Sequence, residues 1–522
     1  RKDNRGSKFQ ISDYAEAAMA KYLLTHDLGT SSDKATLYAA NGELLAHSEQ
    51  SYPVYYAEGG IFAEQDAVDW WNAFCNNNRI LLKDRNPGEV AAVAISGQMM
   101  ACLPVNKQGI PLRRCMIWAD GRAGKENERI ESVVGKDRFY SITGNAPSAN
   151  YTAPKVLYLK EHEPAVFEAA YKFIQPKDYI NLRLTGSFFT DASDAGHTHL
   201  YNIFSGQWSD EILQAVGLAQ NKLPEVVWAG TPIGNVLDSV AEECALLPGT
   251  LVVQGAGDGR AAMLGAGILE KGEAYVCLGT SSWLSAATDK ANMDAHSGLY
   301  KGLSLRKGYY INGGTMQAGG LSYDWYIKNL CCDNPSYAEM EKQITSVSPG
   351  ADGMLYMPYI LGERAPYFDT GAKGAFLGLK ATHTRAHMSR SVMEGVALHL
   401  AIILNRMEKL DAVGSVRIVG GGAKSAIWRQ ILADVFQKSI IKTNVDLNAG
   451  SLGTAVLAGV GAGIFSDISV VKEFHKTEAI SEPDLRTKGM YEELRCILEE
   501  AYHALKNVNG KLSSLSAIQG KE

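Results

Sequence analysis

The sequence has no long apolar run and no excess of positive charge, and each absence excludes a class of protein. No uninterrupted apolar run approaches the roughly 18 residues that a membrane-spanning helix needs. Among the 522 residues, 51 Lys and Arg stand against 57 Asp and Glu, which gives a formal net charge of −6. No basic excess is available to neutralise nucleic-acid phosphates. The sequence therefore predicts neither a membrane partner nor a nucleic-acid partner.

Clustered cysteines are also absent. The eight cysteines are dispersed, no CxxC pair occurs, and only Cys331 and Cys332 are adjacent. We therefore expect neither a zinc site nor a disulfide framework, and we expect a reducing, cytoplasmic compartment. Residues 1–20 have a basic start but no apolar central stretch. They do not resemble a secretory signal, and we expect them to form a loosely ordered extension.

The chain is long enough for more than one hydrophobic core. Apolar residues make up 46% and charged residues 21% of the sequence, as is usual for globular proteins. Because 522 residues exceed what a single core usually serves, we expect two large domains. Glycines and small residues cluster at 265–272, and the expected domain boundary lies there.

A short internal repeat suggests that the two halves are alike. The pentapeptide Leu-Gly-Thr-Ser-Ser begins at Leu28 and again at Leu278, 278 − 28 = 250 residues later. Each copy lies between two apolar runs, which predicts the tip of a β-hairpin with strands at 22–24 and 35–39 in one half and at 274–277 and 283–287 in the other. A further turn is expected at Asn41-Gly42. We interpret the repeat as two structurally similar halves. The alternative is two unrelated polar turns, because turns favour these residues.

Strands and helices alternate elsewhere. The nearly continuous apolar run at 90–95 predicts a strand buried on both faces. Residues 64–74 carry apolar side chains at helical spacing. In the second half, 416–419 predicts a strand that ends at three glycines, and Ser425 is expected to cap a helix. The apolar face of that helix is Ile427, Ile431, Leu432, Val435 and Phe436. The pattern is that of an α/β protein.

The hairpin tips are candidate phosphate sites. Neither GxxxxGK[ST] nor a GxGxxG of the dinucleotide pattern occurs. Gly29 and Gly279 nevertheless allow a phosphate to approach the backbone, and the neighbouring hydroxyls add donors. Two such turns facing each other across a cleft would hold a triphosphate from both sides.

Two acidic residues are candidates for chemistry at these sites. Asp27 precedes the first turn, and an acid beside phosphates implies an intervening Mg²⁺. Asp258 follows a strand and begins a glycine-rich turn, a position from which a carboxylate can accept a hydroxyl proton during phosphoryl transfer. Each acid has a plainer interpretation as a turn residue. Lys34 could reach a phosphate or could simply be a solvated strand lysine.

Together these motifs resemble those of the FGGY carbohydrate kinases, and within that family they are most similar to xylulose kinases. The resemblance covers residues 22 to about 501. Its segments are 27–32 with Lys34, 96–99, 118–122, 152–155, 161–164, 176–179, 190–195, 358–366, 374–379 and 420–425.

The resemblance implies an actin-like ATPase fold, in which two ribonuclease-H-like domains close around a central cleft. It implies a sugar-binding N-terminal domain at 21–266, an ATP-binding C-terminal domain at 267–510, ATP and Mg²⁺ as cofactors, and Asp258 as the general base. Asp27 and Asp258 are the implied metal partners. The residues implied near ATP are Gly29, Thr30, Ser31, Lys34, Gly279, Thr280, Gly421, Gly422 and Ser425. Those implied near the sugar are Gln98, Met99, Met100, Trp118 and Asp258.

Two positions depart from the xylulose kinase pattern. Met100 stands where a histidine is usual, and a thioether offers a sugar only a weak acceptor and apolar bulk. Gly259-Arg260 follows Asp258, where Asn or Gln is common. Arg260 could contact a charged substrate or pair with a surface acid. Both changes bear on the choice of sugar.

The implied reaction is ATP-dependent phosphorylation of a sugar hydroxyl, with D-xylulose as the first candidate. The alternatives within the family are L-ribulose, gluconate, glycerol, a tetritol or a deoxy-ketose. A non-catalytic, actin-like ATP-binding module is a candidate from another class, because fold alone does not fix function. A small sugar or polyol is the expected partner, and the sequence leaves open whether the chain forms a homodimer.

Overall fold

The structure is a computed structural model that describes residues 22–331, 333, 335–445 and 448–519. The extension expected at 1–20 and the second member of the adjacent cysteine pair lie outside the described residues. The chain divides into two compact units. The first unit comprises the described residues up to Thr143 together with Pro147–Gly267 and Gly450–Phe474. The second unit comprises Gly144–Ala146, the described parts of Ile268–Ala449, and the chain from His475 onwards.

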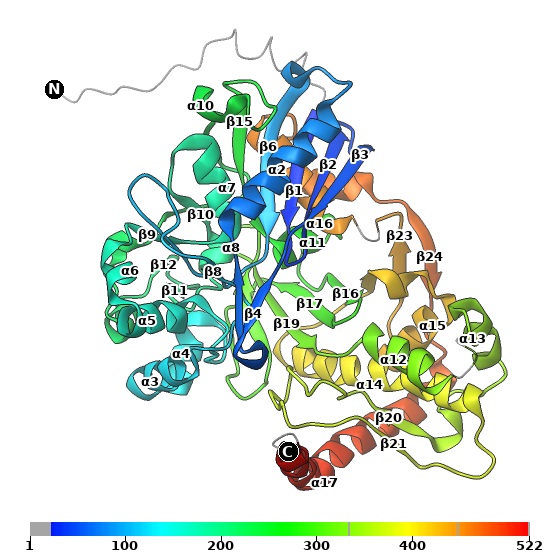
Figure 1. Cartoon of the computed structure of the whole chain (residues 1–522). Coiled ribbons are helices and arrows are strands. Elements are labelled where there is room, and N and C mark those ends of the chain that lie inside the picture. Colours follow the sequence, from blue (N-terminus) through cyan, green and yellow to red (C-terminus); the bar gives the residue numbers. More distant parts are fainter. Residues whose placement is uncertain (1–21, 332, 334, 446–447, 520–522) are drawn as a thin grey trace. The chain divides into compact units, whose positions relative to one another are not determined.

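The first unit contains a six-stranded sheet, and Figure 1 labels its strands β1, β2, β3, β6 and β15. β1 pairs antiparallel with β2 and parallel with β6, and β6 pairs in parallel with β15. The predicted apolar strand forms β6 at the centre of the sheet, where it is buried on both faces as expected. The strands in sheet order are β14 (Pro232–Asn235), β15 (Leu251–Gly257), β6 (Val90–Gly97), β1 (Tyr22–Leu28), β2 (Ser32–Ala39) and β3 (Leu44–Ser51).

Helices cover both faces of this sheet because side chains along its strands alternate between them. Leu24 and Val252 lie in one core with residues of α2 (Ala67–Leu82) and α7 (Pro176–Thr185). The adjacent residues Leu23 and Val253 face the other way and contact α16 (Ala449–Gly461), whose glycines let it approach closely. The sequence analysis did not anticipate that this distant segment belongs to the first unit.

The second unit repeats the same strand pattern with one further strand. β16 pairs antiparallel with β17 and parallel with β22, which pairs in parallel with β23. An antiparallel strand flanks the parallel end of each sheet, β14 in the first unit and β24 in the second. The strands in order are β18 (Tyr300–Leu303), β19 (Tyr310–Met316), β17 (Ser282–Thr288), β16 (Ala274–Leu278), β22 (Val416–Val419), β23 (Ile440–Thr443) and β24 (Thr477–Ser481). The prediction of two similar halves, each built on a hairpin, is confirmed.

Long helices form the core of the second unit. The 26-residue helix α14 (Arg385–Leu410) packs against the sheet and against its neighbouring helices (Figure 1). Those neighbours are α12 (Gly320–Leu330), α13 (Tyr337–Ile344), α15 (Ala426–Phe436) and α17 (Lys488–Gln519). The predicted cap of α15 is confirmed, because Ser425 Oγ accepts a hydrogen bond from Trp428 N at 3.1 Å.

The remainder of the first unit is a mainly helical layer with its own core. Side chains of its helices meet around Ile130, Phe139, Val156 and Ile212. The helices are α3 (Gly124–Val134), α4 (Lys136–Thr143), α5 (Thr152–His162), α6 (Pro164–Ala169) and α9 (Asp210–Val216). Short strands adjoin this layer, namely β4 (Tyr55–Ala57), β5 (Phe62–Gln65), β8 (Cys115–Met116), β7 (Leu103–Val105) and β9 (Lys172–Ile174).

One helix boundary was predicted wrongly. The helix expected to begin at residue 64 begins instead at Ala67, and Glu64 and Gln65 belong to β5. Asp66 separates the two elements, because its carboxylate caps the helix by accepting a hydrogen bond from Val68 N at 3.0 Å.

The contact between α16 and α11 (Asp258–Gly265) yields a stability prediction. A Cβ added at Gly453 would lie 2.0 Å from the carbonyl oxygen of Ala261. We expect Gly453→Ala to destabilise the first unit by ~1–3 kcal/mol, since backbone atoms cannot move aside easily. Gly510→Ala in α17 is the matched control, because a Cβ there meets nothing within 4 Å. Equal thermal unfolding of the two variants would contradict the close approach.

Candidate active site

Two acidic side chains lie at the same edge of the first sheet. β1, β6 and β15 run in parallel, so their carboxyl ends meet at one edge. Asp27 lies near the end of β1 and is half-buried, and Asp258 directly follows β15 and is exposed. The carboxylate of Asp258 accepts a hydrogen bond from Gly259 N at 2.6 Å. The sheet topology thus brings together the two acids that the sequence singled out.

The electrostatics of this pair suit a general base. Desolvation by surrounding protein raises the pKa of Asp258 to about 7, and the negative charge of Asp27 contributes in the same direction. Because solvent reaches this side chain, screening reduces the size of the shift but not its direction. Burial also raises the pKa of Asp27, opposed by Lys34, which lies opposite it on β2.

The first turn is held by side chains that bind its carbonyls. The oxygen of Gly29 accepts hydrogen bonds from Tyr52 Oη at 2.5 Å and Gln98 Nε2 at 3.3 Å. The oxygen of Thr30 accepts one from Gln65 Nε2 at 2.6 Å. Because its carbonyls are held in this way, the backbone of the turn is restrained. The other two predicted residues of this segment, Ser31 and Lys34, are exposed.

The residues predicted near the sugar lie around this turn. Gln98 is buried and donates to Gln65 Oε1 at 2.6 Å, while Trp118 is 36% exposed and donates from its indole to Thr30 Oγ1 at 2.8 Å. Met99 is buried behind the strand end, where a Cβ on Gly257 would lie 2.4 Å from its sulfur. Gln98 and Met99 are therefore buried, and Trp118 is the most accessible of the three.

Met100 has an unusual backbone conformation. Its φ is +64°, in the left-handed region that residues other than glycine rarely adopt. Its side chain is half-buried. Such a conformation persists only where the surrounding structure imposes it, and it is often found near functional sites.

A network of buried side chains holds the backbone directly before Asp258. Ser193 Oγ accepts from Gly257 N at 3.3 Å and donates to the carboxylate of Asp191. Lys177 Nζ lies 2.9 Å from Asp191 Oδ1, with all of these side chains in the interior. Lys177 and Asp191 thus form a buried ion pair, and Ser193 links this pair to the main chain at Gly257. These contacts limit movement of the turn that begins with Asp258.

Arg260, the second position that departs from the family pattern, contacts the same network. Arg260 is buried and donates to His197 Nε2 at 3.1 Å, and His197 Nδ1 donates to Ser193 O at 2.9 Å. Burial and the positive charge of Arg260 lower the pKa of His197 to about 3, so the ring is neutral and can accept this bond. The burial of Arg260 argues against the predicted contact with a charged substrate.

The second turn is built from closely packed glycines. The oxygen of Gly279 accepts from Gly320 N at 2.7 Å, and that of Thr280 accepts from Leu321 N at 3.1 Å, at the start of α12. A Cβ on Gly320 would lie 2.6 Å from the Gly279 oxygen. Gly279 is half-buried and Thr280 is exposed.

The glycine segment predicted near adenosine adjoins this turn. Gly420 has a φ of +91°, and a Cβ on Gly422 would lie 2.4 Å from Leu278, the residue before Gly279. Gly421 is exposed, while Gly422 and Ser425 are half-buried. The structure therefore brings the predicted ATP residues of the second unit together. Ser425 has a structural role as the cap of α15, and its predicted contact with adenosine stays a prediction.

The sequence analysis missed several supporting residues. Tyr52, Gln65 and Gly320 hold the turns, and Ser193 and His197 support the acid. No motif marks Tyr52, Gln65, Gly320 or His197, because each acts on a residue far away in the chain, and Ser193 lies in the segment 190–195, to which no role was given. The motif at 190–195 was noticed only through the family resemblance.

Two further findings concern partners. No helix in the described part of the chain combines the length and the apolar character that a bilayer span requires. The seven described cysteines are free thiols.

The fold and the acid–turn arrangement define the class of protein. Two α/β units repeat one ribonuclease-H-like sheet, and each carries a glycine-bearing hairpin turn, which is the actin-like ATPase fold. The chain belongs to the FGGY family of carbohydrate kinases. Residues 22–265 match the N-terminal domain of that family and residues 274–462 match its C-terminal domain.

Similar proteins include several sugar kinases. The chain is 31% identical to the xylulose kinase of Bacillus subtilis, over 95% of this chain and 99% of that one. It is 26% identical to the gluconokinase of the same organism, over 87% of this chain and 90% of that protein. The crystal structure of a ligand-bound xylulose kinase from Lactobacillus acidophilus superposes with a TM-score of 0.89 at 25% identity, covering 94% of this chain and all of that one.

The raised pKa of Asp258 gives a pH prediction. If Asp258 is the general base it acts only when deprotonated, so kcat/KM for the sugar should fall about tenfold per pH unit as the pH drops below the point at which Asp258 becomes protonated. We expect the midpoint to lie well above the ordinary value near 4 and no higher than about 7. A profile that stays flat from pH 8 down to pH 5 would contradict this assignment.

Proposed function

We propose that the protein transfers the γ-phosphoryl group of ATP to a hydroxyl of D-xylulose, forming D-xylulose 5-phosphate. The observation that carries the proposal is the exposed acid Asp258, whose pKa is raised, at the strand edge that it shares with Asp27. The names of the most similar relatives support the choice of sugar. The free described cysteines support a reducing, cytoplasmic setting.

The two acids fit a magnesium ion. The negative charge of Asp27 raises the pKa of Asp258, and a divalent cation would offset this repulsion. Mg²⁺ in kinases is commonly held by one or two carboxylates together with substrate phosphates. Asp27 and Asp258 would hold the ion, which when bound neutralises charge on the phosphates. Gly29, Thr30, Ser31 and Lys34 are proposed to bind phosphate from the first unit. The proposed ATP residues of the second unit are Gly279, Thr280, Gly421, Gly422 and Ser425.

The protein's own contribution to the chemistry is proton removal and positioning. Asp258 accepts the proton of the attacking hydroxyl as that oxygen forms a bond to the γ-phosphorus. The bond between this phosphorus and the β–γ bridging oxygen breaks, and ADP leaves. Phosphoryl transfer depends mainly on positioning and electrostatics, so the rigid support behind Asp258 is part of the mechanism.

A substrate panel tests the choice of sugar. ADP formation would be followed with D-xylulose, L-ribulose, gluconate, glycerol and a tetritol. We expect the highest kcat/KM with D-xylulose. A higher value with another acceptor would replace the sugar but keep the kinase. An ATPase rate indifferent to every acceptor would favour a non-catalytic ATP-binding module.

Replacement of the proposed base tests the mechanism. Asp258→Asn keeps the shape of the side chain but cannot accept the proton, so we expect kcat to fall about 10²-fold or more. ATP affinity, measured by titration in the absence of sugar, should change little. Turnover near that of the wild type would remove Asp258 from this role.

Met100 tests which residues face the sugar. Met100→His restores the group usual in xylulose kinases, and histidine tolerates left-handed backbone better than most residues. If the native substrate is a sugar other than D-xylulose, the added hydrogen bond should lower KM for D-xylulose about 3- to 10-fold while leaving KM for ATP unchanged. An unaltered substrate profile would place Met100 outside the sugar pocket.

A further inference from the structure

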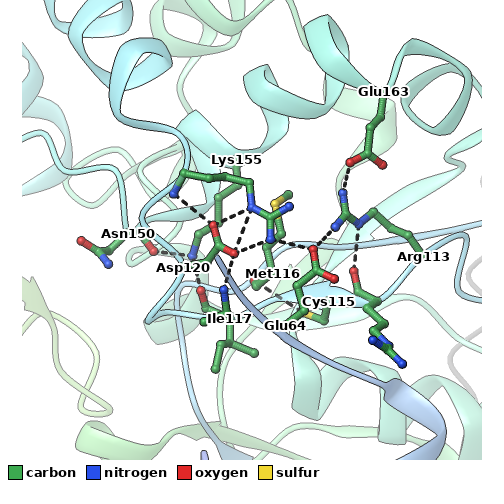
Figure 2. Close-up of polar contacts among 12 residues, drawn as sticks. Glu64, Arg113, Cys115, Met116, Ile117, Asp120, Asn150, Lys155 and Glu163 are labelled. Atoms are coloured by element: carbon green, nitrogen blue, oxygen red, sulfur yellow. Dashed lines mark hydrogen bonds and ion pairs between the residues drawn. The ribbon is translucent and has the colours of Figure 1, made fainter. Parts of the chain in front are cut away.

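Lys155 is a buried cation that binds only backbone oxygens. It lies in α5, and its side chain is fully buried. Its Nζ donates to Met100 O at 2.9 Å. It also donates to Ile117 O and Asn150 O, each at 2.6 Å, and both residues are labelled in Figure 2. Among the described residues no carboxylate forms an ion pair with it. All three of its N–H donors are thus used on the main chain.

The three oxygens come from three segments that are distant in sequence and share one location. Met100 O belongs to the segment that follows β6. Ile117 O directly precedes Trp118. Asn150 O belongs to the segment before α5, and the side chain of Asn150 donates to Trp118 O at 2.9 Å. Lys155 therefore links the main chain at Met100 to the main chain directly before Trp118. Met100 and Trp118 are two of the residues proposed to face the sugar.

Neighbouring contacts reinforce the same segments. Thr152, one turn earlier on α5, donates to Ala101 O at 2.8 Å, next to the left-handed Met100. Ala101 N donates to Gln175 Oε1 at 2.8 Å. On the other side of Trp118, Asp120 is buried, accepts from Ala63 N at 2.8 Å and pairs with Arg122 at 2.6 Å. The segments are therefore anchored on every side, with Lys155 between them.

A plain structural role would not require a charge here. Burying an ammonium group without a carboxylate is unfavourable, and burial lowers the pKa of Lys155 to about 8. Asp120, Cys102 and Cys115 oppose that shift, and Arg122 adds to it. Only the protonated amine has three hydrogens for three carbonyls. The arrangement is thus costly and specific, as expected for a site that must be preorganised.

We propose that Lys155 is a positioning residue for the sugar site, because it fixes the main chain at Met100 and beside Trp118. This inference rests on the proposed function, since it assumes that these two residues face the sugar. Loss of the cation would remove one hydrogen bond from each of three carbonyls, leave Ile117 O with only its bond from Asp120 N at 3.0 Å, and let the segments move. Sugar binding would weaken, while ATP binding to the glycine-bearing turns would not.

The test compares Lys155→Met with Lys160→Met. Lys160 is on the same helix and also donates to carbonyls, those of Val216 and Gly217 at 3.5 and 3.0 Å, which are not part of the three segments. We expect Lys155→Met to raise KM for the sugar at least tenfold with KM for ATP within twofold of the wild type. Lys160→Met should change neither. A sugar KM within twofold of the wild type, or equal increases in both KM values, would overturn the proposal.

Amide hydrogen exchange gives a readout that does not need activity. Lys155→Met should speed exchange in peptides covering 98–101, 116–120 and 148–152 and leave the β15–α11 turn protected. Unchanged exchange would overturn the positioning role. If the wild type forms no ADP with any acceptor, the proposed function fails, and the exchange result still decides whether Lys155 holds these segments.

If Lys155→Met does not fold, the pH dependence of the wild-type protein tests the proposal. Raising the pH from 7.5 to 9.5 removes the third hydrogen of Lys155. Among its neighbours, burial raises the pKa of Cys102 to about 12 and also raises that of Cys115. Asp120 and Glu64 outweigh burial and raise the pKa of Arg122. We expect the sugar KM to rise at least threefold with an unchanged ATP KM. A constant sugar KM over this range would overturn the proposal.

Discussion

The parallel pairing of β1, β6 and β15 is the constraint on which the candidate site depends. Parallel strands end at one edge, so Asp27 and Asp258 lie near each other although 231 residues separate them (258 − 27). Their charges repel, and burial of both adds to the effect, so the folded chain keeps Asp258 less acidic than an ordinary aspartate. The sheet thus gives Asp258 a raised pKa, which suits the general-base role proposed for it.

Rigidity around this edge comes from side chains that act on the backbone. The first turn is held through its carbonyls by Tyr52, Gln65 and Gln98. The amide of Gly257, directly before Asp258, is held by Ser193. Because these hydrogen bonds are made to the main chain, they occupy no oxygen of the Asp27 and Asp258 carboxylates.

Local patterns predicted much of the fold, and long-range packing explains the rest. The repeated Leu-Gly-Thr-Ser-Ser identified both hairpins, because a turn and its flanking strands are contiguous in sequence. Ser425 could be assigned as a cap for the same reason. The start of α2 was misplaced because Glu64 and Gln65 fit a helical pattern equally well, and only their pairing in β5 distinguishes them. Nothing local indicates that α16 packs against Leu23 and Val253.

Lys155 shows most clearly which features of the candidate site could not be predicted from the sequence. A lysine on an amphipathic helix is normally solvated, and the family resemblance marked its segment without giving it a role. Its partners are backbone oxygens, which every residue carries, so no side-chain pattern could reveal them. Carbonyl partners also have a functional consequence. They fix the main chain while leaving the side chains of Met100 and Trp118 to vary, so the same lysine can support pockets for different sugars. The side chains of the pocket would then determine which sugar binds, and the scaffold would hold these side chains in position. The departure from the family pattern at Met100, on a main chain that Lys155 still fixes, is consistent with this arrangement.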